Sequence, residues 1–491
     1  MKSPAFDAER PVLVLFRNDR RVADNAALAA AARTGKPVVA AFVLEDPLGG
    51  ARAPGGAWRW WLHHSLAALG RSLAQMGVSL VLRRGRMGDV VESLVAESGA
   101  DAVFWNRRYD PGAIAADTVM KAALRERGLA VESFAGHLLH EPSRLVTSTG
   151  GSYKVYSPFW KALVAGPEPR DPLDAPERLN PFAGMLHSED LHAFGLLPTK
   201  PDWAGGLRRS WTPGEDGALA LLDDFIADAL ADYAEGRDYP AREVTSRLSP
   251  YLAHGEITPF QIFAALRHAA DDMSGAGAAK FCKEVGWREF CYHLLFHHPH
   301  LDTQNFQPSF DAFPWREDKQ ALRAWQRGLT GFPIVDAGMR ELWETGIMHN
   351  RMRMVAASFL TKHLLVDWRA GEQWFWDTLV DADPASNPGN WQWVAGCGAD
   401  AAPYFRIFNP VLQGEKFDPE GRYVRRWLPE LARLPSRFIH RPWEAPSAVL
   451  AESGVKPGET YPRPIVDLRL ARERALGAYE TARSAFRSSA P

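Results

Sequence analysis

The feature that most constrains the fold is a change of pattern along the chain. In the first 140 residues, short apolar runs alternate with helical patterns. The runs are "PVLVLF" (11–16), "PVVAAFVL" (37–44), "VSLVLRRG" (78–85), "DAVFWN" (101–106) and "LAVESFAG" (129–136). Such alternation predicts a doubly wound parallel sheet. After about residue 216 almost every segment has helical periodicity instead. A chain of 491 residues also exceeds the size of one hydrophobic core, so we predict an α/β domain followed by an all-helical one.

The predicted boundaries follow this change of pattern. We expect an α/β domain over residues 1–140, a linker over 141–215 and a helical domain over 216–491. The linker is predicted because ten of the 36 prolines fall between Pro142 and Pro213. The loop after the first strand, "RNDRRVADN", contains no glycine, so the fingerprint for a dinucleotide pyrophosphate is absent. The α/β domain is therefore not expected to hold the main cofactor.

Composition excludes several classes of protein. No apolar run approaches the roughly 20 residues of a membrane span, and the start "MKSPAFDAERPVLVLF" lacks the features of a signal peptide. Cys282, Cys291 and Cys397 are too few for a disulfide framework or a four-thiolate cluster. We expect a cytoplasmic protein without a membrane partner. The net charge of −2 means that any binding of nucleic acid must come from a local patch.

The stretch "RDYPAREVTSRLSPYLAHGEIT" (237–258) carries Thr245, Ser246, Arg247 and Ser249 just before a helical run. Hydroxyl groups and an arginine near a helix start can cradle phosphate. The same residues can serve only as a helix N-cap, and taken alone they favour this simpler interpretation.

The stretch "FCKEVGWREFCYHLLFHHP" (281–299) carries Glu284, Trp287 and Arg288 at positions i, i+3 and i+4. These three residues share one face of a helix. A carboxyl group, a large aromatic ring and a cation on one face can serve a flat heteroaromatic ligand. The alternative is an amphipathic helix with an internal ion pair.

The stretch "GIMHNRMRMVAASFL" (346–360) separates two arginines. Asn350, Arg353 and Met354 share a helix face, whereas Arg351 lies about 200° from Arg353 around the axis. One arginine can thus face an interior acid while the other reaches solvent or a phosphate. Two solvated arginines on a surface helix are the alternative, which the apolar run that follows disfavours.

The stretch "DADPASNPGNWQW" (381–393) combines acids, an amide and tryptophans. Asp381, Asp383 and Asn387 can bind hydroxyl groups or a ring edge, and they offer too few oxygen ligands for calcium, so no metal is predicted. Several tryptophans separated by helical segments can form an electron-hopping chain. By spacing alone, ordinary core packing explains them better. The three concerned are Trp391, Trp368 and Trp315.

Taken in order, these motifs closely resemble the DNA photolyase/cryptochrome family. The resemblance covers nearly the whole chain, and within the family it is strongest to bacterial cyclobutane-pyrimidine-dimer photolyases. "NRRYDP" (106–111) suggests the class III branch, near plant cryptochromes. The matching stretches are "FRNDRRVADNAAL", "TSRLSPYLAHGEITP", "WREF", "GFPIVDAGMRELWETGIMHNRMRMVAASFLTKHLLVDW", "DADPASNPGNWQW" and "DAAPYFRIFNPVLQGEKFDPEGRYVRRWLPEL".

The resemblance implies a U-shaped FAD buried in the helical domain. Phe281 stands at a flavin contact where many members have tryptophan, and Asn387 stands opposite flavin N5, where plant cryptochromes carry aspartate. The residues implied to hold the phosphates are Tyr233, Thr245, Ser246, Arg247, Leu248 and Ser249. Those implied to surround the ribityl, adenine and isoalloxazine groups are Arg288, Asn350, Arg353, Asp381 and Asp383.

The resemblance also implies the reaction, which is light-driven splitting of cyclobutane pyrimidine dimers in DNA by an electron from excited, reduced FAD. Glu284, expected to be protonated, and Asn350 hydrogen-bond the flipped-out dimer and the adenine. Asn387 tunes the flavin, and the three tryptophans reduce it when it is oxidised. Enzymes for the (6-4) lesion need a histidine where this chain has Asn350 and Met354. The residues implied to contact DNA are Arg237, Glu284, Trp287, Asn350, Arg351, Met354 and Trp393.

The antenna pigment and the alternatives follow from the same resemblance. Asp110 matches an acid of pterin-binding members, whereas Asp302 and Thr303 replace a cysteine and a lysine of some bacterial relatives. We expect 5,10-methenyltetrahydrofolate, with 8-hydroxy-5-deazaflavin second, and a monomer that binds UV-damaged DNA. The alternatives are a cryptochrome-type blue-light photoreceptor with little or no repair activity and a light-independent flavin oxidoreductase.

Overall fold

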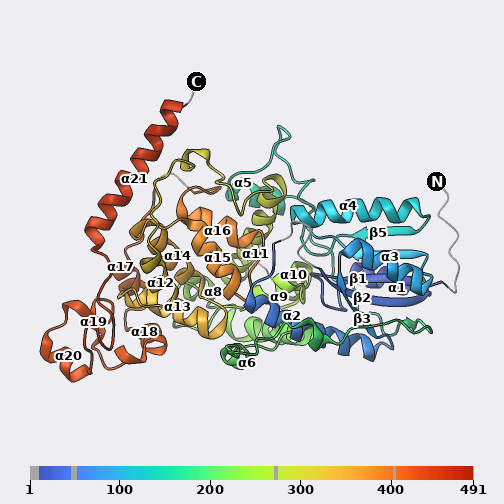
Figure 1. Ribbon diagram of the computed structural model, residues 1–491, viewed down its shortest axis with the longest axis horizontal. Coiled ribbons are helices and arrows are strands. Elements are labelled where there is room, and N and C mark those ends of the chain that lie inside the picture. Colours follow the sequence, from blue (N-terminus) through green and yellow to red (C-terminus); the bar gives the residue numbers. More distant parts are fainter. Residues whose placement is uncertain (1–9, 46–51, 270–274, 402–404, 490–491) are drawn as a thin grey trace.

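A computed structural model describes residues 10–45, 52–269, 275–401 and 405–489. Figure 1 shows two parts, an α/β part near the N-terminus and a helical part that contains the rest of the chain. Both contribute to the candidate site described below.

The α/β part is built on a parallel sheet with the strand order β3-β2-β1-β4-β5. All five predicted strands are confirmed, and a two-residue strand, β6 (Asn180–Pro181), also pairs with β2. In the register Val14 lies opposite Ala40 on one side and Phe104 on the other. The strands are β1 (Val12–Phe16), β2 (Pro37–Glu45), β3 (Leu80–Gly85), β4 (Ala102–Asn106) and β5 (Ala130–Phe134).

Helices cover both faces of this sheet, which explains why its strands are almost continuously apolar. Val12, Val14 and Phe16 pack with α1 (Ala26–Arg33) and the second half of α2 (Gly56–Gln75). Leu13 and Leu15 point to the other face, where α3 (Met87–Ser98) and α4 (Pro111–Glu126) lie. The sheet is thus buried on both sides, as expected for a doubly wound fold.

The stretch between the two parts is partly helical. It contains α5 (Tyr156–Val164), the short helix η1 (Leu191–Phe194) and α6 (Gly205–Ser210). Phe159 of α5 is buried and contacts Phe290 with a ring-centroid distance of 5.1 Å. This stretch therefore contributes to the packing of the helical part, a role that its high proline content did not indicate.

The helical part matches the predicted helical periodicity, up to its last helix, α21. None of the helices in the described ranges is long and apolar enough to cross a membrane. The helices are α7 (Glu215–Asp224), η2 (Phe225–Ala229), α8 (Tyr233–Gly236), α9 (Ser249–His254), α10 (Pro259–Ala269), α11 (Ala276–His297), α12 (Lys319–Gln326), α13 (Pro333–Thr345), α14 (Asn350–Ser358), η4 (Phe359–His363), α15 (Trp368–Thr378), α16 (Ser386–Ala395), α17 (Pro410–Phe417), α18 (Arg422–Trp427), α19 (Ser436–Ile439), α20 (Ser447–Ser453) and α21 (Leu468–Ser489).

The loop after β1 joins the two parts, and we call residues 17–25 together with 254–258 the domain clasp. Arg21 Nη1 donates to the carbonyl oxygen of Gly255 at 2.9 Å. Gly255 has a φ of +67°, and a Cβ atom there would lie 1.9 Å from the carbonyl oxygen of Asn18, so only glycine fits. Glu256 is fully buried in the clasp and accepts a hydrogen bond from Trp61 Nε1 at 3.0 Å.

The buried carboxyl group of Glu256 predicts a pH-dependent stability. Burial raises the pKa of Glu256 to about 7, above its ordinary value of 4.5. Between these two values the folded protein holds a proton that the unfolded chain has already released. The stability that Glu256 contributes is therefore highest below pH 4.5 and falls as pH rises to about 7. The loss, fully reached above about pH 7, is at most roughly 3 kcal/mol. Buried histidines such as His349 and His363, whose pKa burial lowers to about 4, act in the opposite direction, so we measure the contribution of Glu256 as a difference between wild type and a variant.

The variant Glu256→Gln isolates this contribution, because its amide cannot ionise. The melting temperature of wild type minus that of the variant should become smaller between about pH 5 and about pH 8. Glu289, whose pKa burial also raises to about 7, is present in both proteins and cancels from this difference. A difference that is the same at both pH values would show that Glu256 does not titrate in this range.

Candidate functional site

The candidate site lies where the turn before α16 meets α11 and α14, and its centre holds two buried aspartates. Asp383 caps α16, since its Oδ1 accepts from the backbone N–H groups of Ala385 and Ser386 at 2.9 and 2.6 Å. Its Oδ2 accepts from the hydroxyl group of Tyr292 on α11 at 2.7 Å. Three hydrogen-bond donors thus hold the Asp383 carboxylate in one orientation.

Asp381 pairs with Arg353, as the helix-face argument predicts. Its Oδ2 accepts from Arg353 Nη2 at 2.8 Å and from Ser249 Oγ at 2.6 Å. Its Oδ1 is buried and has no hydrogen-bond partner within the described part of the chain. Because a buried acceptor without a partner is costly, this oxygen marks a place for a ligand.

Arg288 lies on the side of α11 that faces the α/β part. Its Nη1 donates to the carbonyl oxygen of His137 at 3.0 Å, and its Nη2 lies 2.7 Å from His137 Nε2. The guanidinium group also lies over the ring of Tyr292, 5.0 Å from the centroid. Its Nε is buried without a partner among the described residues.

The three residues expected to serve one ligand from one face of α11 have different partners. Arg288 reaches toward His137, whereas Glu284 forms ion pairs with Arg237 and, at 2.9 Å, with Lys280. The alternative of an ion pair within the helix is therefore correct for Glu284. The carboxyl group that we expect to be protonated is paired with two cations, Arg237 and Lys280. Long side chains that start on one face can diverge, which explains the difference.

The tryptophans expected to contact the lesion are both half-buried. Trp287 stacks on Tyr156 of α5, with centroids 3.8 Å apart and ring planes 8° apart. This stacking orients one flat face of the indole. Trp393 of α16 donates from Nε1 to the carbonyl oxygen of Asp400 at 3.1 Å. Each ring is thus held in place by a contact outside the helix that carries it.

Arg351 points away from Arg353, as predicted for residues two apart on a helix. Arg351 Nη2 pairs with Asp238 Oδ2 at 2.8 Å, and its guanidinium group lies 4.4 Å from the ring centroid of Phe417. It borders an open cavity of about 380 Å³. The other lining residues are Glu235, Asp238, Tyr239, Phe408, Gln413, Lys416 and Phe417. Asn350 and Met354 belong to the same helix, α14, and are exposed and half-buried respectively.

The segment before α9 does not form the helix cap that its residues suggest. No side chain caps the start of α9. Instead, the hydroxyl group of Ser249 reaches Asp381, and Ser246 Oγ accepts weakly from the backbone N–H of Leu248 at 3.4 Å. Arg247 has a φ of +54° and lays its guanidinium group over the ring of Trp211, 4.3 Å from the centroid. Thr245 is half-buried in the same segment.

An aromatic wall borders this segment. Phe281 of α11 is buried and contacts Phe225 and Tyr233, with ring-centroid distances of 4.6 and 5.4 Å. Leu248 is also buried and belongs to the same hydrophobic cluster. Phenylalanine fills this position without leaving a polar group unpaired.

Asn387 is oriented by a residue that the sequence did not single out. Its Nδ2 donates to Oε1 of Glu372 at 2.8 Å and to the carbonyl oxygen of Glu372 at 3.1 Å. The amide nitrogen is therefore occupied on the α15 side. Glu372 lies on a different helix, and no motif or spacing links it to Asn387.

The three tryptophans of the expected electron path lie on neighbouring segments. Trp391 packs against Phe375 at a centroid distance of 4.9 Å, and a Cβ atom on Gly371 would lie 2.2 Å from its ring. Trp368 begins α15 one turn before Gly371 and is fully buried. Trp315 is half-buried, and the next residue, Arg316, donates its N–H to the carbonyl oxygen of Leu365 at 2.7 Å. The expected path from Trp391 through Trp368 to Trp315 thus leads from two buried side chains to a half-buried one.

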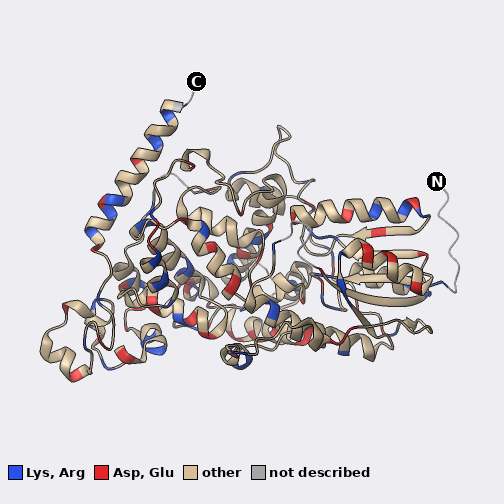
Figure 2. Cartoon of the chain, viewed as in Figure 1, with Lys and Arg blue, Asp and Glu red and all other residues tan. Residues whose placement is uncertain are grey.

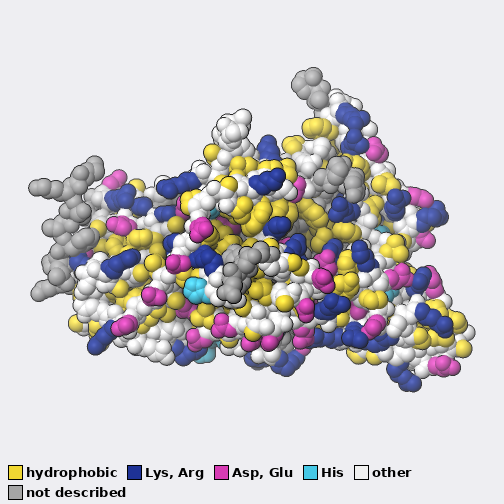
Figure 3. All heavy atoms as spheres, turned by 180° about the vertical axis from the view of Figure 1, so that it is seen from behind, with side chains coloured by type: hydrophobic (Ala, Val, Ile, Leu, Met, Phe, Trp, Pro, Cys, Tyr) yellow, Lys and Arg dark blue, Asp and Glu magenta, His cyan; other side chains and the backbone are white. Residues whose placement is uncertain are grey.

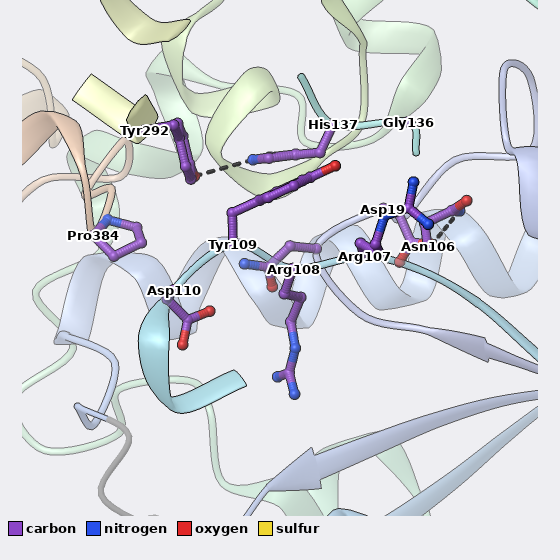
Figure 4. A pocket seen from close by; sticks show the side chains of 11 residues that line it. Asp19, Asn106, Arg107, Arg108, Tyr109, Asp110, Gly136, His137, Tyr292 and Pro384 are labelled. Carbon is purple, nitrogen blue, oxygen red and sulfur yellow. Dashed lines mark hydrogen bonds between the residues drawn. The ribbon is translucent and has the colours of Figure 1, made fainter. Parts of the chain in front are cut away.

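Asp110 caps α4, accepting from the backbone N–H of Ala113 at 2.8 Å. It borders a narrow cavity of about 20 Å³ at the carboxyl ends of β1 and β4, where the strand order reverses. Figure 4 shows Tyr109, His137 and Tyr292 gathered there, with a hydrogen bond of 3.0 Å between His137 and Tyr292. This enclosed space has room for about one water molecule.

Charges of both signs are interspersed over the two parts (Figure 2), in keeping with the net charge of −2. On the face turned away in that view, hydrophobic side chains gather toward the middle and lysine and arginine are scattered around them (Figure 3). No uniform basic coat is visible on that face.

Two family models match the chain. The model for DNA photolyase matches residues 12–177, and the model for the FAD binding domain of DNA photolyase matches residues 281–481. The first covers the α/β part, and the second covers most of the helical part, including the buried aspartates.

Individual relatives match nearly end to end. The deoxyribodipyrimidine photo-lyase of Agrobacterium fabrum is 57% identical over 96% of this chain and 97% of its own length. Cryptochrome-2 of Arabidopsis thaliana is 39% identical over 97% of this chain and 80% of its own. The crystal structure of a bacterial class III photolyase from Agrobacterium tumefaciens superposes with a TM-score of 0.95 at 55% identity, covering 98% of this chain and 99% of that one. The chain belongs to the DNA photolyase/cryptochrome family.

Proposed function

We propose that this protein is a light-driven DNA repair enzyme that splits cyclobutane pyrimidine dimers with the help of bound FAD. The observation that carries the proposal is the buried amide of Asn387, at the position where plant cryptochromes carry aspartate. At this position a neutral amide adds no negative charge beside a reduced, anionic flavin, which suits a flavin that has to be held in its electron-donating state. Membership of the family and the near full-length similarity to photo-lyases support the same function.

The residues of the site fit FAD. Two buried polar atoms lack partners within the described residues, Asp381 Oδ1 and Arg288 Nε, and each can be satisfied by a polar ligand between them and the neighbouring side chains. Asp381 and Asp383 offer acceptors for hydroxyl or ring N–H groups, and Arg353 supplies a compensating charge. Bound FAD supplies a light-absorbing electron donor, a chemistry that side chains lack.

Each part of the site has a distinct task in this proposal. Arg353 holds the Asp381 carboxyl group turned inward, and Tyr292 fixes Asp383. The hydroxyl-bearing segment and the aromatic wall bind the phosphates and the ring system. The tryptophan series carries electrons from the surface. The phosphate group is assigned to Tyr233, Thr245, Ser246, Arg247, Leu248 and Ser249, the wall to Phe281, and the electron path to Trp391, Trp368 and Trp315.

The DNA contacts use the opposite side of α14 and the exposed edge of α11. A dimer has to leave the duplex to reach the flavin, and flat indole faces such as that of Trp287 can receive it. Glu284 has to leave Arg237 or Lys280 in order to hydrogen-bond the lesion, and Arg351 has to exchange Asp238 for a phosphate. The remaining contacts are assigned to Arg237, Asn350, Met354 and Trp393.

Further details belong to the proposal. We assign a folate antenna, 5,10-methenyltetrahydrofolate, with Asp110 among its contacts, and 8-hydroxy-5-deazaflavin as the second choice. The protein acts as a cytoplasmic monomer on UV-damaged DNA. Residues 1–140 form the antenna domain, 141–215 connect the two parts and 216–491 form the catalytic domain.

The test is a repair assay on an oligonucleotide with one thymine dimer, with reduced protein under blue light and a dark control. We expect thymine absorbance to return only in the light. Bound, photoreducible FAD without any return of absorbance would contradict repair and favour a photoreceptor of the cryptochrome type.

A further inference from the structure

A short segment of the α/β part docks onto the second half of α15. Trp376 Nε1 donates to the carbonyl oxygen of Ala53 at 2.8 Å, and the N–H of Gly56 donates to Asp377 Oδ1 at 2.8 Å. A Cβ atom on Gly55 would lie 2.1 Å from the carbonyl oxygen of Trp376, so this contact requires glycine. Residues 52–56 are therefore held against α15, although they belong to the other part of the molecule.

Arg52 begins this segment and forms a two-pronged ion pair with Glu372. Its Nη1 and Nη2 lie 2.6 and 2.8 Å from the two carboxylate oxygens. The guanidinium group also lies over the ring of Trp376, 4.2 Å from the centroid, and donates to Gln373 Oε1 at 2.8 Å. The side chain of Glu372 is 3% exposed and that of Arg52 is 25% exposed. Arg52 thus lies between the buried carboxylate of Glu372 and the solvent.

Glu372 connects this ion pair to the flavin site. The same Oε1 that accepts from Arg52 accepts from Asn387 Nδ2 at 2.8 Å. A continuous chain of hydrogen bonds therefore leads from Arg52 of the α/β part, through Glu372 of α15, to the amide of Asn387 on α16.

We propose that Arg52 is a positioning residue for the reaction, which acts through Glu372 to fix the end of the Asn387 amide that faces the flavin. The inference rests on the proposed function, because it concerns the amide beside the bound cofactor. It assigns the α/β part a direct role in the electron-transfer site.

The charge of Glu372 strengthens or weakens the observed orientation of the amide, which the carbonyl oxygen of Glu372 also supports by accepting from Nδ2. An ionised carboxylate only accepts, so it binds only the nitrogen end of Asn387 and leaves the oxygen end for the flavin. A neutral carboxyl group can instead donate to the amide oxygen, which weakens the preference for this orientation. The charged groups that act on Glu372 are Arg52, which favours its ionised form, and Asp302, which opposes it.

Burial already raises the pKa of Glu372, and Arg52 counteracts that rise. Removal of the guanidinium group therefore raises the pKa further. As pH falls, a growing fraction of the variant carries a neutral Glu372 and a disordered amide. The disorder of the Asn387 amide in the variant should accordingly appear at low pH and fade as pH rises, because the Glu372 carboxylate is restored.

The experiment compares wild type, Arg52→Gln and Arg52→Lys, with Gln373→Ala as the matched control that removes a contact of Arg52 but keeps the ion pair. FAD content and the dark reoxidation of light-reduced flavin in air are followed by absorbance between about pH 6 and pH 9. We expect all four proteins to bind FAD. At the lowest pH, flavin reoxidation in Arg52→Gln should be on the order of tenfold faster than in wild type, which matches the loss of one hydrogen bond to a charged group. At the highest pH, its rate should approach that of wild type.

Arg52→Lys should show a smaller pH-dependent change, because it keeps the charge and loses the fork, and Gln373→Ala should match wild type. Reoxidation in Arg52→Gln that equals wild type at every pH overturns the inference, as does an equal change at every pH, which indicates a merely structural role. If Arg52→Gln does not fold, a flat pH profile in Arg52→Lys overturns it. Wild type that binds FAD but repairs no dimer contradicts the proposed function, while the pH profiles still test Arg52. Wild type without FAD overturns both.

Discussion

Asp381→Ala is expected to give a folded protein that has lost its FAD. The substitution removes the partner of Arg353 and Ser249 and the buried oxygen that lacks a protein partner. Breaking one side of a buried ion pair costs about 3–5 kcal/mol. Where this free energy is lost from the FAD-bound state, FAD binding weakens by roughly a hundredfold or more. The measurement is the ratio of flavin to protein absorbance after purification, followed by titration with FAD.

The matched control is Asp367→Ala. Asp367 is also an aspartate that pairs with an arginine, Arg369 at 3.0 Å, but it lies at the start of α15, and its side chain is about one-third exposed. This variant should keep its FAD. Full FAD content and wild-type affinity in Asp381→Ala would contradict the assignment of Asp381 to the cofactor.

Trp391→Phe is expected to slow light-driven reduction of bound FAD by at least about tenfold, which corresponds to roughly 1.4 kcal/mol in the barrier. Trp391 and Asn387 are four residues apart on α16 and so share a face, which places this indole nearest the flavin end of the electron path. Phenylalanine keeps most of the packing against Phe375 and Gly371 but is much harder to oxidise. The measurement is the decay of oxidised-flavin absorbance under blue light with an external electron donor.

Trp325→Phe is the control for this experiment. Trp325 is fully buried and lies edge-on to Trp391 at a centroid distance of 6.0 Å, but it is not part of the proposed path. FAD bound to Trp325→Phe should be photoreduced at the wild-type rate. Chemically reduced Trp391→Phe should still repair a dimer, because the path serves only to reduce oxidised flavin. Undiminished photoreduction in Trp391→Phe would contradict the path.

The parts of the fold that sequence predicts well are those set by local patterns. The five strands were predictable because their β-branched and apolar runs are buried on both faces, and α21 because its alanines, such as Ala471 and Ala475, recur at helical spacing and pack inward. The separation of Arg351 from Arg353 also follows from helix geometry alone.

The parts that sequence does not predict depend on contacts between distant segments. Arg52 reaches Glu372, and Glu372 orients Asn387, yet the first of these residues lies on a loop of the other part and no periodicity relates them. The pairing of Glu284 with Arg237 is missed for a similar reason, because a helix face gives the starting direction of a side chain and not its end point. The sequence pattern therefore predicts where helices and strands lie, whereas tertiary contacts determine which charged side chains pair.

The most direct test of the proposed repair activity presents two lesions side by side to chemically reduced protein. One oligonucleotide carries a thymine dimer and the other a (6-4) photoproduct, and each is incubated in blue light and in the dark. We predict that only the thymine dimer is repaired, and only in the light, because splitting a cyclobutane ring needs an electron but no histidine acid. Repair of the (6-4) lesion, repair in the dark, or no repair by protein with reduced FAD would contradict the account.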